Sequence, residues 1–532
     1  MDDTYSFGAF VDQRDGLDWY ADDSVLQQVL RHYAGDDWES ADRAARRISP
    51  LVAGPWRRLA EEAARPEMRP RVLHYDGFGE RIDRLERPMQ IEKLENEVFS
   101  LGLFSKTTPP WSRLIQLLLI YENGEACIAC PLVCTEGLIA LLERFADRPE
   151  THAILSHCRD GHDGHFAIGA QYLSEIQGGS DVPANVAEAV PDGDGWRIFG
   201  QKFFCSATHA DYAVITARPR GSDTIGLFVM QSYENQSSKR RNGFTIDRLK
   251  WKMGTVELPT AEITLNGARA WQVGPIDRGV ANVTGIVLTT SRLTVGLSSA
   301  ANMIRAVREA RLYADFRTAF GQPIGHYPLV IGQLQTLARR AHETLAGAFK
   351  IYRDSLSLPD GFRGGLASGE PENLRRRAFR VRELVMLQKL VASLDSTDVL
   401  RGAMSIFGGH GIMEDFSALP RLFRDSAINE LWEGPRNVLL TQIHRDLQRA
   451  AHFYPAAAFV QDLLAGAPST VIDPLAKEAA TLVAHPSLLT PDDATVAIAG
   501  RLEQWAHVLM HAYQAQALRE VETKKGFQTA KP

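Results

Sequence analysis

The chain has 532 residues and a mass of 59.0 kDa, more than one hydrophobic core usually supports, so we expect several structural units. Its net charge of -6 provides no general attraction for phosphate polymers and disfavours nucleic acid as a partner. The apolar runs are too short to span a bilayer, and the acidic start (MDDT) is unlike a secretory signal. With 5 cysteines, an odd number, these features predict a cytoplasmic protein with no membrane contact and no disulfide framework.

Hydrophobic periodicity divides the sequence into four parts and predicts the α+β fold class. Residues 1–168 are expected to form an N-terminal helical domain, all-helical, with helices at 24–33, 41–62, 91–104 and 135–145. Residues 169–275 contain short β-branched and aromatic runs between turn signals, and predict a middle β-barrel or sandwich. Residues 276–450 predict a four-helix bundle, with helices at 293–316, 332–353, 374–406 and 429–449. Residues 451–532 predict a helical extension.

The cysteines raise the question of a metal site. Cys127, Cys130, Cys134 and Cys158, with a His-rich loop around His162, lack the second pair of ligands that a zinc site needs, so we predict no metal. The three- and four-residue steps between the first three cysteines are typical of small buried residues on one helix face.

Two motifs in the β region could line a ligand. In the segment 172–182 (YLSEIQGGSDV), the adjacent glycines Gly178 and Gly179 allow close approach of the backbone, and small hydroxyl groups can line a polar ring or a phosphate. About 25 residues later, the segment 200–207 (GQKFFCSA) carries an aromatic face at Phe204 and a hydroxyl at Ser206. Each motif alone is compatible with an ordinary loop or with core aromatics on a strand.

Two further motifs lie in the helical region. The segment 317–324 (RTAFGQPI) follows a long helix, and its guanidinium at Arg317 is suited to bidentate contact with phosphate. The last motif is a series, IFGGHG at 406–411, RLFRD at 421–425 and NELWEG at 429–434, which ends in the carboxylate of Glu433. Taken alone, Glu433 is more typical of a carboxylate that complements the dipole of the following helix, and only the four motifs together favour a catalytic role.

These four motifs, in this order, resemble the acyl-CoA dehydrogenase superfamily over roughly residues 65–450. Several details resemble its AidB-type, adaptive-response branch in particular: the segments 73–83 (LHYDGFGERID), 130–132 (CPL), 177–181 (QGGSD) and 431–434 (LWEG), together with the length of the chain. The resemblance implies an acyl-CoA dehydrogenase-like fold and FAD as the cofactor.

The resemblance also implies roles for individual residues. Leu173 and Ser174 would face the pyrimidine ring of the flavin. Ser180, together with the adjacent Gly179, would contact the pyrophosphate. Phe204 would pack on the isoalloxazine, and the hydroxyl of Ser206 would reach its N5 atom. From a neighbouring subunit, Arg317, with Phe320 beside it, would contact the pyrophosphate. The dinucleotide would lie against Gly408, Gly409 and Gly411 across a subunit interface, and Arg292 would orient the catalytic loop.

The resemblance further implies a reaction. Glu433 would remove an α proton from an acyl thioester, a coenzyme A or carrier-protein ester, while hydride leaves the β carbon for flavin N5. Electrons would pass to an electron-transfer flavoprotein, and the enzyme would be a homotetramer or dimer.

Departures from the family pattern keep alternatives open. Ser405 replaces a family Gln, and Pro435-Arg436-Asn437 replaces a Thr-x-Gln, so Arg436 could instead meet a phosphate or a substrate carboxylate. An oxidase or monooxygenase on the same fold remains one alternative. A flavin-bearing DNA- or protein-binding module with vestigial activity is another, although residues 448–532 hold 7 Lys/Arg against 8 Asp/Glu and so disfavour DNA.

Overall fold

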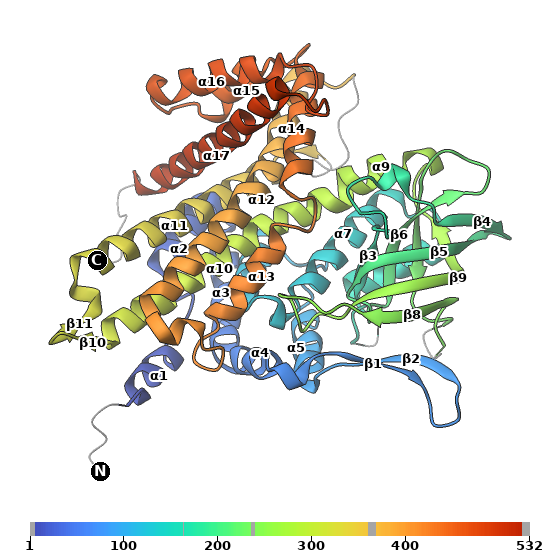
Figure 1. Ribbon diagram of the computed structural model, residues 1–532, viewed down its shortest axis with the longest axis horizontal. Coiled ribbons are helices and arrows are strands. Elements are labelled where there is room, and N and C mark those ends of the chain that lie inside the picture. Colours follow the sequence, from blue (N-terminus) through green and yellow to red (C-terminus); the bar gives the residue numbers. More distant parts are fainter. Residues whose placement is uncertain (1–5, 163, 236–239, 360–368, 524–532) are drawn as a thin grey trace. The chain divides into compact units, whose positions relative to one another are not determined.

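The chain folds into two compact units, one assembled from both ends of the sequence and the other from the stretch between them. The computed structural model describes residues 6–162, 164–235, 240–359 and 369–523, without the side chain of Cys127. One unit comprises Met1–Ala53 with Arg292–Pro532, and the other comprises Gly54–Ser291 (Figure 1). The four-part division predicted from the sequence stays a prediction.

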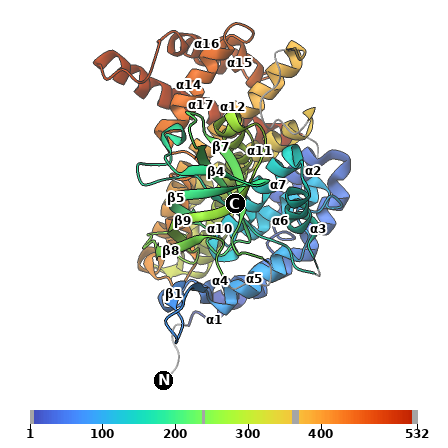
Figure 2. The ribbon, with the colours of Figure 1, turned by 90° about the vertical axis from the view of Figure 1, so that its right-hand side faces the viewer.

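The second unit is built around a seven-stranded sheet (Figure 2). Its strands are β3 (Gly169–Tyr172), β4 (Glu188–Asp192), β5 (Gly195–Ser206), β6 (Tyr212–Pro219), β7 (Gly226–Gln231), β8 (Phe244–Leu249) and β9 (Thr260–Gln272). The pairings β6–β4–β5–β9–β7 return to β6 and close a ring, to which β3 is added beside β6 and β8 beside β9. The predicted barrel-like β domain is therefore confirmed, and ring closure leaves few exposed strand edges.

Helices and a hairpin complete this unit. The helices are α4 (Arg57–Ala63), α5 (Met89–Phe99), α6 (Pro110–Tyr121), α7 (Ala129–Phe145), α8 (Pro149–Asp160) and the short α9 (Gly279–Asn282). The expected all-helical first part is wrong for residues 71–86, where β1 (Arg71–Tyr75) and β2 (Arg81–Glu86) form an antiparallel hairpin. Alternating exposed and half-buried residues on β1, followed by the turn residues Asp76-Gly77, explain the strands.

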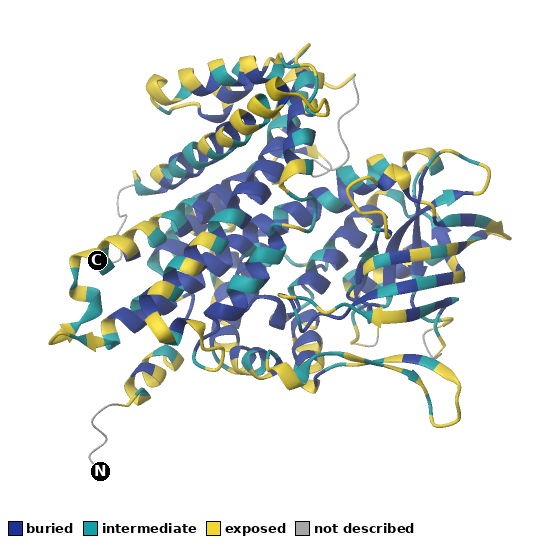
Figure 3. Cartoon of the chain, in the orientation of Figure 1, coloured by how far each residue is buried: buried dark blue, intermediate teal, exposed yellow. Residues whose placement is uncertain are grey.

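The first unit is a helical bundle. It contains α1 (Gly8–Asp15), α2 (Ser24–Ala34), α3 (Trp38–Leu51), α10 (Thr289–Phe316), α11 (Pro328–Leu356), α12 (Glu372–Phe407), α13 (Leu419–Asn429) and α14 (Arg436–Ala450). A short hairpin, β10 (Thr318–Ala319) with β11 (Gln322–Pro323), joins α10 to α11. The buried faces of the long helices point toward one another, which is why their apolar residues recur at helical spacing (Figure 3).

The C-terminal extension belongs to the same core. Its helices α15 (Ala456–Leu463), α16 (Ser469–Val483) and α17 (Asp493–Glu522) confirm the predicted helical character. Leu475, Leu482, Trp505 and Leu509 lie in one apolar cluster with buried residues of α12 and α14. Because its buried face continues the bundle core, the extension is an integral part of this unit.

One helical stretch, Ile276–Phe316, meets the length and composition expected of a membrane span among the described residues. Most of its apolar window is buried inside the protein, as in the core helix of a soluble protein.

Candidate active site

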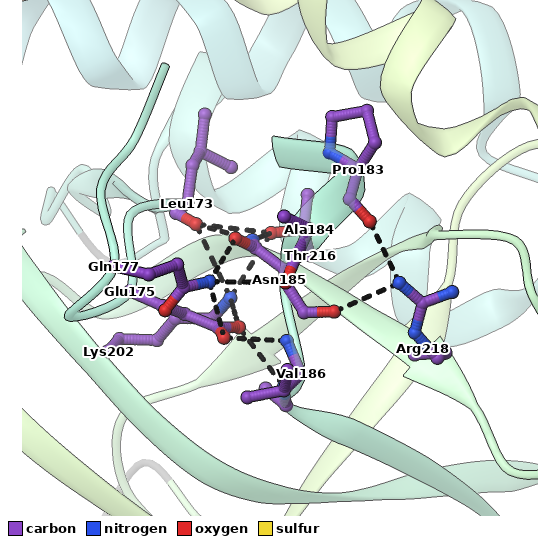
Figure 4. Close-up of polar contacts among 11 residues, drawn as sticks. Leu173, Glu175, Gln177, Pro183, Ala184, Asn185, Val186, Lys202, Thr216 and Arg218 are labelled. Atoms are coloured by element: carbon purple, nitrogen blue, oxygen red, sulfur yellow. Dashed lines mark hydrogen bonds and ion pairs between the residues drawn. The ribbon is translucent and has the colours of Figure 1, made fainter. Parts of the chain in front are cut away.

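The loop that follows β3 is held by a buried ion pair (Figure 4). Lys202 Nζ lies 2.8 Å from Glu175 Oε1, and the two side chains are 0% and 3% exposed. The Glu175 carboxylate also accepts hydrogen bonds from the backbone N–H groups of Val186, at 2.7 Å, and Ala187, at 3.2 Å. Burial raises the pKa of Glu175, but the ammonium of Lys202 and these donors outweigh burial and hold it below its ordinary value. The carboxylate is therefore an anchor of the loop.

A second set of contacts fixes where the loop begins (Figure 4). Asn185 Nδ2 donates to the carbonyl oxygen of Leu173 at 2.7 Å and to Thr216 Oγ1 at 3.0 Å. The backbone N–H of Phe203, on β5, donates to the carbonyl oxygen of Ser174 at 3.0 Å. Ser174, predicted to contact the flavin, is thus tied directly to β5, and Leu173 is tied through Asn185 to Thr216 of β6.

The glycines of this loop have different structural roles. A Cβ on Gly179 would lie 2.1 Å from Ser174 Oγ and 3.1 Å from Ser174 Cβ, so the hydroxyl keeps its position only beside glycine. Gly178 has φ of 126°, in the region that favours glycine. Gly179 and Ser180 are exposed, and their backbone and hydroxyl groups are open to a ligand.

The second predicted flavin-binding segment lies on β5, next to the first. Phe204 is 53% exposed although it lies within a strand, at a point where the pairing of β5 with β9 shifts between Lys202 and Cys205. Lys250 Nζ lies 4.5 Å from the centre of the Phe204 ring. Two residues on, Ser206 Oγ lies 3.1 Å from Thr260 Oγ1. The second unit therefore brings together the predicted residues of both segments.

The third predicted segment forms the β10–β11 hairpin in the first unit. Arg317 precedes β10 and is half-buried, whereas Phe320 at the tip is 98% exposed and has φ of 51°. Tyr327 donates its hydroxyl hydrogen to the carbonyl oxygen of Ala319 at 2.7 Å. The hairpin thus presents an aromatic ring to the outside.

The three predicted glycines after α12 differ in their surroundings. A Cβ on Gly411 would lie 2.2 Å from the carbonyl oxygen of Met404, so Gly411 is required for packing. Gly408 and Gly409 are exposed, with open space where a Cβ would be, and Gly408 has φ of 59°. Only these two offer an accessible backbone surface.

Glu433 lies in the turn between α13 and α14. The sequence predicts a helix over 429–449, but α13 ends at Asn429 and α14 begins only at Arg436. Glu433 has φ of 59° and Gly434 has φ of 101°, conformations that stop a right-handed helix. Glu433 is also not the N-cap residue of α14, a position that Pro435 occupies.

Buried cations surround this turn. Arg292, on α10, is 3% exposed and donates through Nε to the carbonyl oxygen of Glu433 at 2.8 Å. Lys389, on α12, is 1% exposed, and its Nζ donates to the carbonyl oxygens of Gly434 at 2.8 Å and of Glu430 at 3.1 Å. Arg292, predicted to orient the loop, thus lies directly behind it.

The Glu433 carboxyl group is itself unusual. Its Oε2 is buried and has no hydrogen-bond partner among the described residues. Burial raises its pKa to about 7, although Arg292 and Lys389 act in the opposite direction. Burial likewise lowers the pKa of Lys389 to about 7. The turn therefore holds a carboxyl group that can gain and lose a proton near neutral pH.

Arg436 has a partner within the chain. Its Nη1 lies 3.0 Å from Glu503 Oε1, on α17 of the C-terminal extension. A carboxylate of the protein itself thus lies where the sequence suggests a phosphate or a substrate carboxylate.

The predicted single helix face holds for two of the three cysteines, because Cys127 ends a short 3-10 turn, Glu125–Cys127, and the left-handed Ile128 separates it from α7. Cys130 and Cys134 are buried on α7, with their sulfur atoms 3.7 Å apart, and Cys158 is buried on α8. The side chain of Cys127 lies outside the described residues. Within those residues, no group of three or more His, Cys, Asp or Glu side chains could hold a metal ion.

Sequence reasoning missed four residues that hold the predicted site segments in place. Three of them, Glu175, Asn185 and Lys202, hold the loop after β3, and the fourth, Lys389, holds the turn of Glu433. Glu175 and Lys202 both lie inside motifs that were recognised, so the signal for an ion pair was present. No local signal distinguishes Asn185 or Lys389 from surface residues.

Comparisons with known proteins agree with this arrangement. The family model for the acyl-CoA dehydrogenase middle domain matches residues 170–268, and the model for the C-terminal domain of the same family matches residues 277–448; together they cover just over half of the chain. Acyl-CoA dehydrogenase family member 11 of Caenorhabditis elegans is 29% identical over 80% of this chain and 70% of its own length. The putative acyl-CoA dehydrogenase AidB of Escherichia coli is 25% identical over 83% of this chain and 80% of its own.

The fold is shared as well. The structure of Caenorhabditis elegans ACDH-11 covers 95% of this chain and 88% of its own, with a TM-score of 0.82 at 24% sequence identity. The predicted resemblance and fold class are thereby confirmed. The predicted FAD cofactor is supported by the structure of an acyl-CoA dehydrogenase from Bacillus anthracis complexed with FAD, which covers 98% of this chain and 86% of its own with a TM-score of 0.64 at 17% identity. The chain belongs to the acyl-CoA dehydrogenase family of flavin-dependent oxidoreductases, and its homologues include AidB.

Proposed function

We propose that this protein catalyses the α,β-dehydrogenation of an acyl-CoA, with Glu433 as the base. One observation carries the proposal: a buried carboxyl oxygen without a hydrogen-bond partner among the described residues, on a group whose pKa burial raises to about 7. A general base works best when its pKa lies near the operating pH. Because no described group of the protein hydrogen-bonds to Oε2, this oxygen can accept a proton from the substrate.

The second unit fits FAD. Exposed backbone at Gly179, the Ser174 and Ser180 hydroxyls and the exposed ring of Phe204 are the kinds of group that hold a flavin and its pyrophosphate. In the first unit, Arg317 and the open backbone of Gly408 and Gly409 would contribute from a neighbouring subunit.

Glu433 and the two cations that contact its turn have different roles in the reaction. The α C–H bond breaks as Glu433 Oε2 takes the proton, and the electron pair forms the new double bond as hydride leaves the β carbon. Bound FAD supplies the hydride acceptor, flavin N5. Arg292 and Lys389 favour the carboxylate before the transfer, and burial favours the neutral acid after it. The opposed influences allow Glu433 to gain and release the proton without a large change in free energy.

The substrate class follows from a relative. The ACDH-11 structure is described as a complex with C11-CoA, which supports a fatty acyl-CoA as the substrate here. We propose an electron-transfer flavoprotein as the acceptor of the electrons.

Exposed apolar side chains support a homo-oligomer. Phe320 at the hairpin tip is 98% exposed, Leu329 at the start of α11 is 84% exposed, and Ile412 after the glycine motif is 76% exposed. Large apolar side chains that are exposed together, and not singly, are typical of surfaces that a protein partner covers. We propose that a second copy of this chain covers them, in a dimer or tetramer.

The deciding experiment is an anaerobic titration of the FAD-loaded protein with short, branched and long acyl-CoAs. Loss of the oxidised flavin absorbance in the wild type, and its absence in Glu433→Gln, is the expected result. Glu478→Gln is the matched control, because Glu478 is a carboxylate of the same unit that pairs with Arg501, at 2.7 Å, on α17.

Other outcomes would point elsewhere. Tight FAD binding without bleaching by any acyl-CoA would refute dehydrogenation. Hydrogen peroxide formed in air during turnover would identify oxygen as the acceptor in place of a flavoprotein.

A further inference from the structure

Lys389 occupies an unusual place for a lysine. It lies in the middle of α12, 1% exposed, in a helix whose neighbouring residues are apolar or buried. An ammonium group so deeply buried is costly unless it makes several strong hydrogen bonds. Its Nζ makes two, at 2.8 Å and 3.1 Å, and both acceptors are backbone carbonyls of the turn that carries Glu433.

These two contacts lie on either side of Glu433. The carbonyl of Glu430 lies three residues before it and the carbonyl of Gly434 one residue after it, while Arg292 holds the carbonyl of Glu433 itself. Glu433 has φ of 59°, a left-handed conformation that is unfavourable for a residue with a Cβ. A strained residue keeps its conformation only where its surroundings fix it.

We propose that Lys389 is a positioning residue for the catalytic base: its buried ammonium clamps the backbone on both sides of Glu433 and so fixes the direction of the carboxylate. The inference rests on the proposed role of Glu433. The acceptors of Lys389 Nζ are backbone carbonyls, so its influence on the carboxylate passes through the backbone and through its charge.

The charge of Lys389 has a consequence for pH dependence. The charged groups that face Glu433 are Arg292 from α10 and Lys389 from α12, and Glu430 lies in the same turn as Glu433. The charge of Arg292 is in turn influenced by Arg382 and Glu383 of α12 and by Asp446 of α14. Since both cations favour the carboxylate, loss of Lys389 leaves Arg292 alone in that role, and Glu433 should hold its proton to higher pH.

Three variants separate positioning from charge. Lys389→Met removes the hydrogen bonds and the charge, and Lys389→Gln keeps N–H donors without the charge. Lys350→Met is the matched control, because Lys350 is a buried lysine of the same bundle, 8% exposed, that pairs with Glu520 at 2.7 Å away from the turn. Each variant is studied as the FAD-loaded enzyme, and its melting temperature and FAD content are measured to confirm folding.

Two readouts are needed. The first is the anaerobic rate of flavin reduction by a saturating acyl-CoA as a function of pH. The second is the titration of the Glu433 carboxyl by infrared spectroscopy, isolated as the difference from Glu433→Gln, which requires no turnover.

We expect both Lys389 variants to move the Glu433 titration upward by about one pH unit. At high pH, where Glu433 is ionised in every variant, Lys389→Met should remain slower than Lys350→Met by about tenfold or more, and Lys389→Gln should fall between them. A Lys389→Met enzyme with the rate and titration of Lys350→Met would overturn the inference, and should Lys389→Met fail to fold, Lys389→Gln decides by the same comparison. An upward shift of the titration in a protein that no acyl-CoA reduces would instead refute the proposed function while supporting the effect of Lys389 on Glu433.

Discussion

The buried pair Glu175–Lys202 should control how tightly the protein holds FAD. In Glu175→Gln the ammonium of Lys202 stays buried but loses its counter-ion, and the N–H groups of Val186 and Ala187 lose a charged acceptor. Removing one partner of a buried ion pair typically costs about 3–5 kcal/mol. Because the pair and Asn185 hold the loop that begins at Leu173, we expect much of this cost to appear as disorder of that loop. If ordering the loop takes about 3 kcal/mol from the free energy of FAD binding, the dissociation constant for FAD rises about 100-fold.

The assay is a titration of apoprotein with FAD, followed by quenching of flavin fluorescence, together with urea denaturation. The matched control is Glu188→Gln, in the same sheet, because Glu188 pairs with Arg220 at 2.6 Å on the surface, where water screens the interaction. Equal FAD affinities for Glu175→Gln and Glu188→Gln would refute the argument that the buried pair organises the loop. If Glu175→Gln lowers the free energy of unfolding strongly but leaves the affinity for FAD unchanged, the buried pair stabilises the fold and does not organise the loop for FAD.

Three further predictions follow from single residues. In the folded protein the pKa of Glu433 is raised from 4.5 to about 7, so between these pH values the folded protein binds more protons than the unfolded chain. The free energy of unfolding should therefore fall as pH rises from 4.5 to about 7. Thermal melts of Glu433→Gln at different pH values should lack this dependence. Gly411→Ala should prevent stable folding, since its Cβ would meet the Met404 carbonyl at 2.2 Å, whereas Gly409→Ala should melt like the wild type and bind FAD more weakly; equal melting of the two contradicts this. Phe320→Asn, which suits the left-handed backbone, should lower the oligomeric state in sedimentation velocity, and an unchanged state would argue against the hairpin as an interface.

The long elements of the fold were predictable because their pattern repeats over many residues. The helices α10, α11 and α12 each carry many buried apolar positions at helical spacing, so a single residue that departs from the pattern does not hide the helix. The β1–β2 hairpin was missed because its strands are only 5 and 6 residues long and are half-buried on one side, which leaves little contrast to detect. The segment 430–435 was wrongly predicted as helix because its residues before Gly434-Pro435 are ordinary helix formers, and the tertiary contacts of the turn override that preference.

The candidate site was predictable only where its residues are close in sequence. Glu433 and the glycines lie in compact motifs, but Lys389 lies 44 residues before Glu433 and Lys202 lies 27 residues after Glu175, as their numbers in the chain show. A lysine within a helical pattern is normally a solvated residue. Only the packing of α12 against the turn shows that the Lys389 ammonium is buried and bonded to carbonyls. Burial of charge depends on the whole fold, so sequence spacing cannot reveal it.

The two predicted sites share one physical arrangement, in which a buried lysine orders a segment that must remain partly open to a ligand. Lys202 orders the loop that carries Ser174 and Gly179 through the carboxylate of Glu175, and Lys389 orders the turn of Glu433 through backbone carbonyls. The two lysines differ in whether a carboxylate balances their charge. Because Glu175 neutralises Lys202, the loop should keep its structure over a wide pH range, whereas Lys389, with carbonyl partners and a pKa lowered to about 7 by burial, can lose its charge near neutrality. Changes of pH should therefore affect proton abstraction well before they affect the binding of FAD.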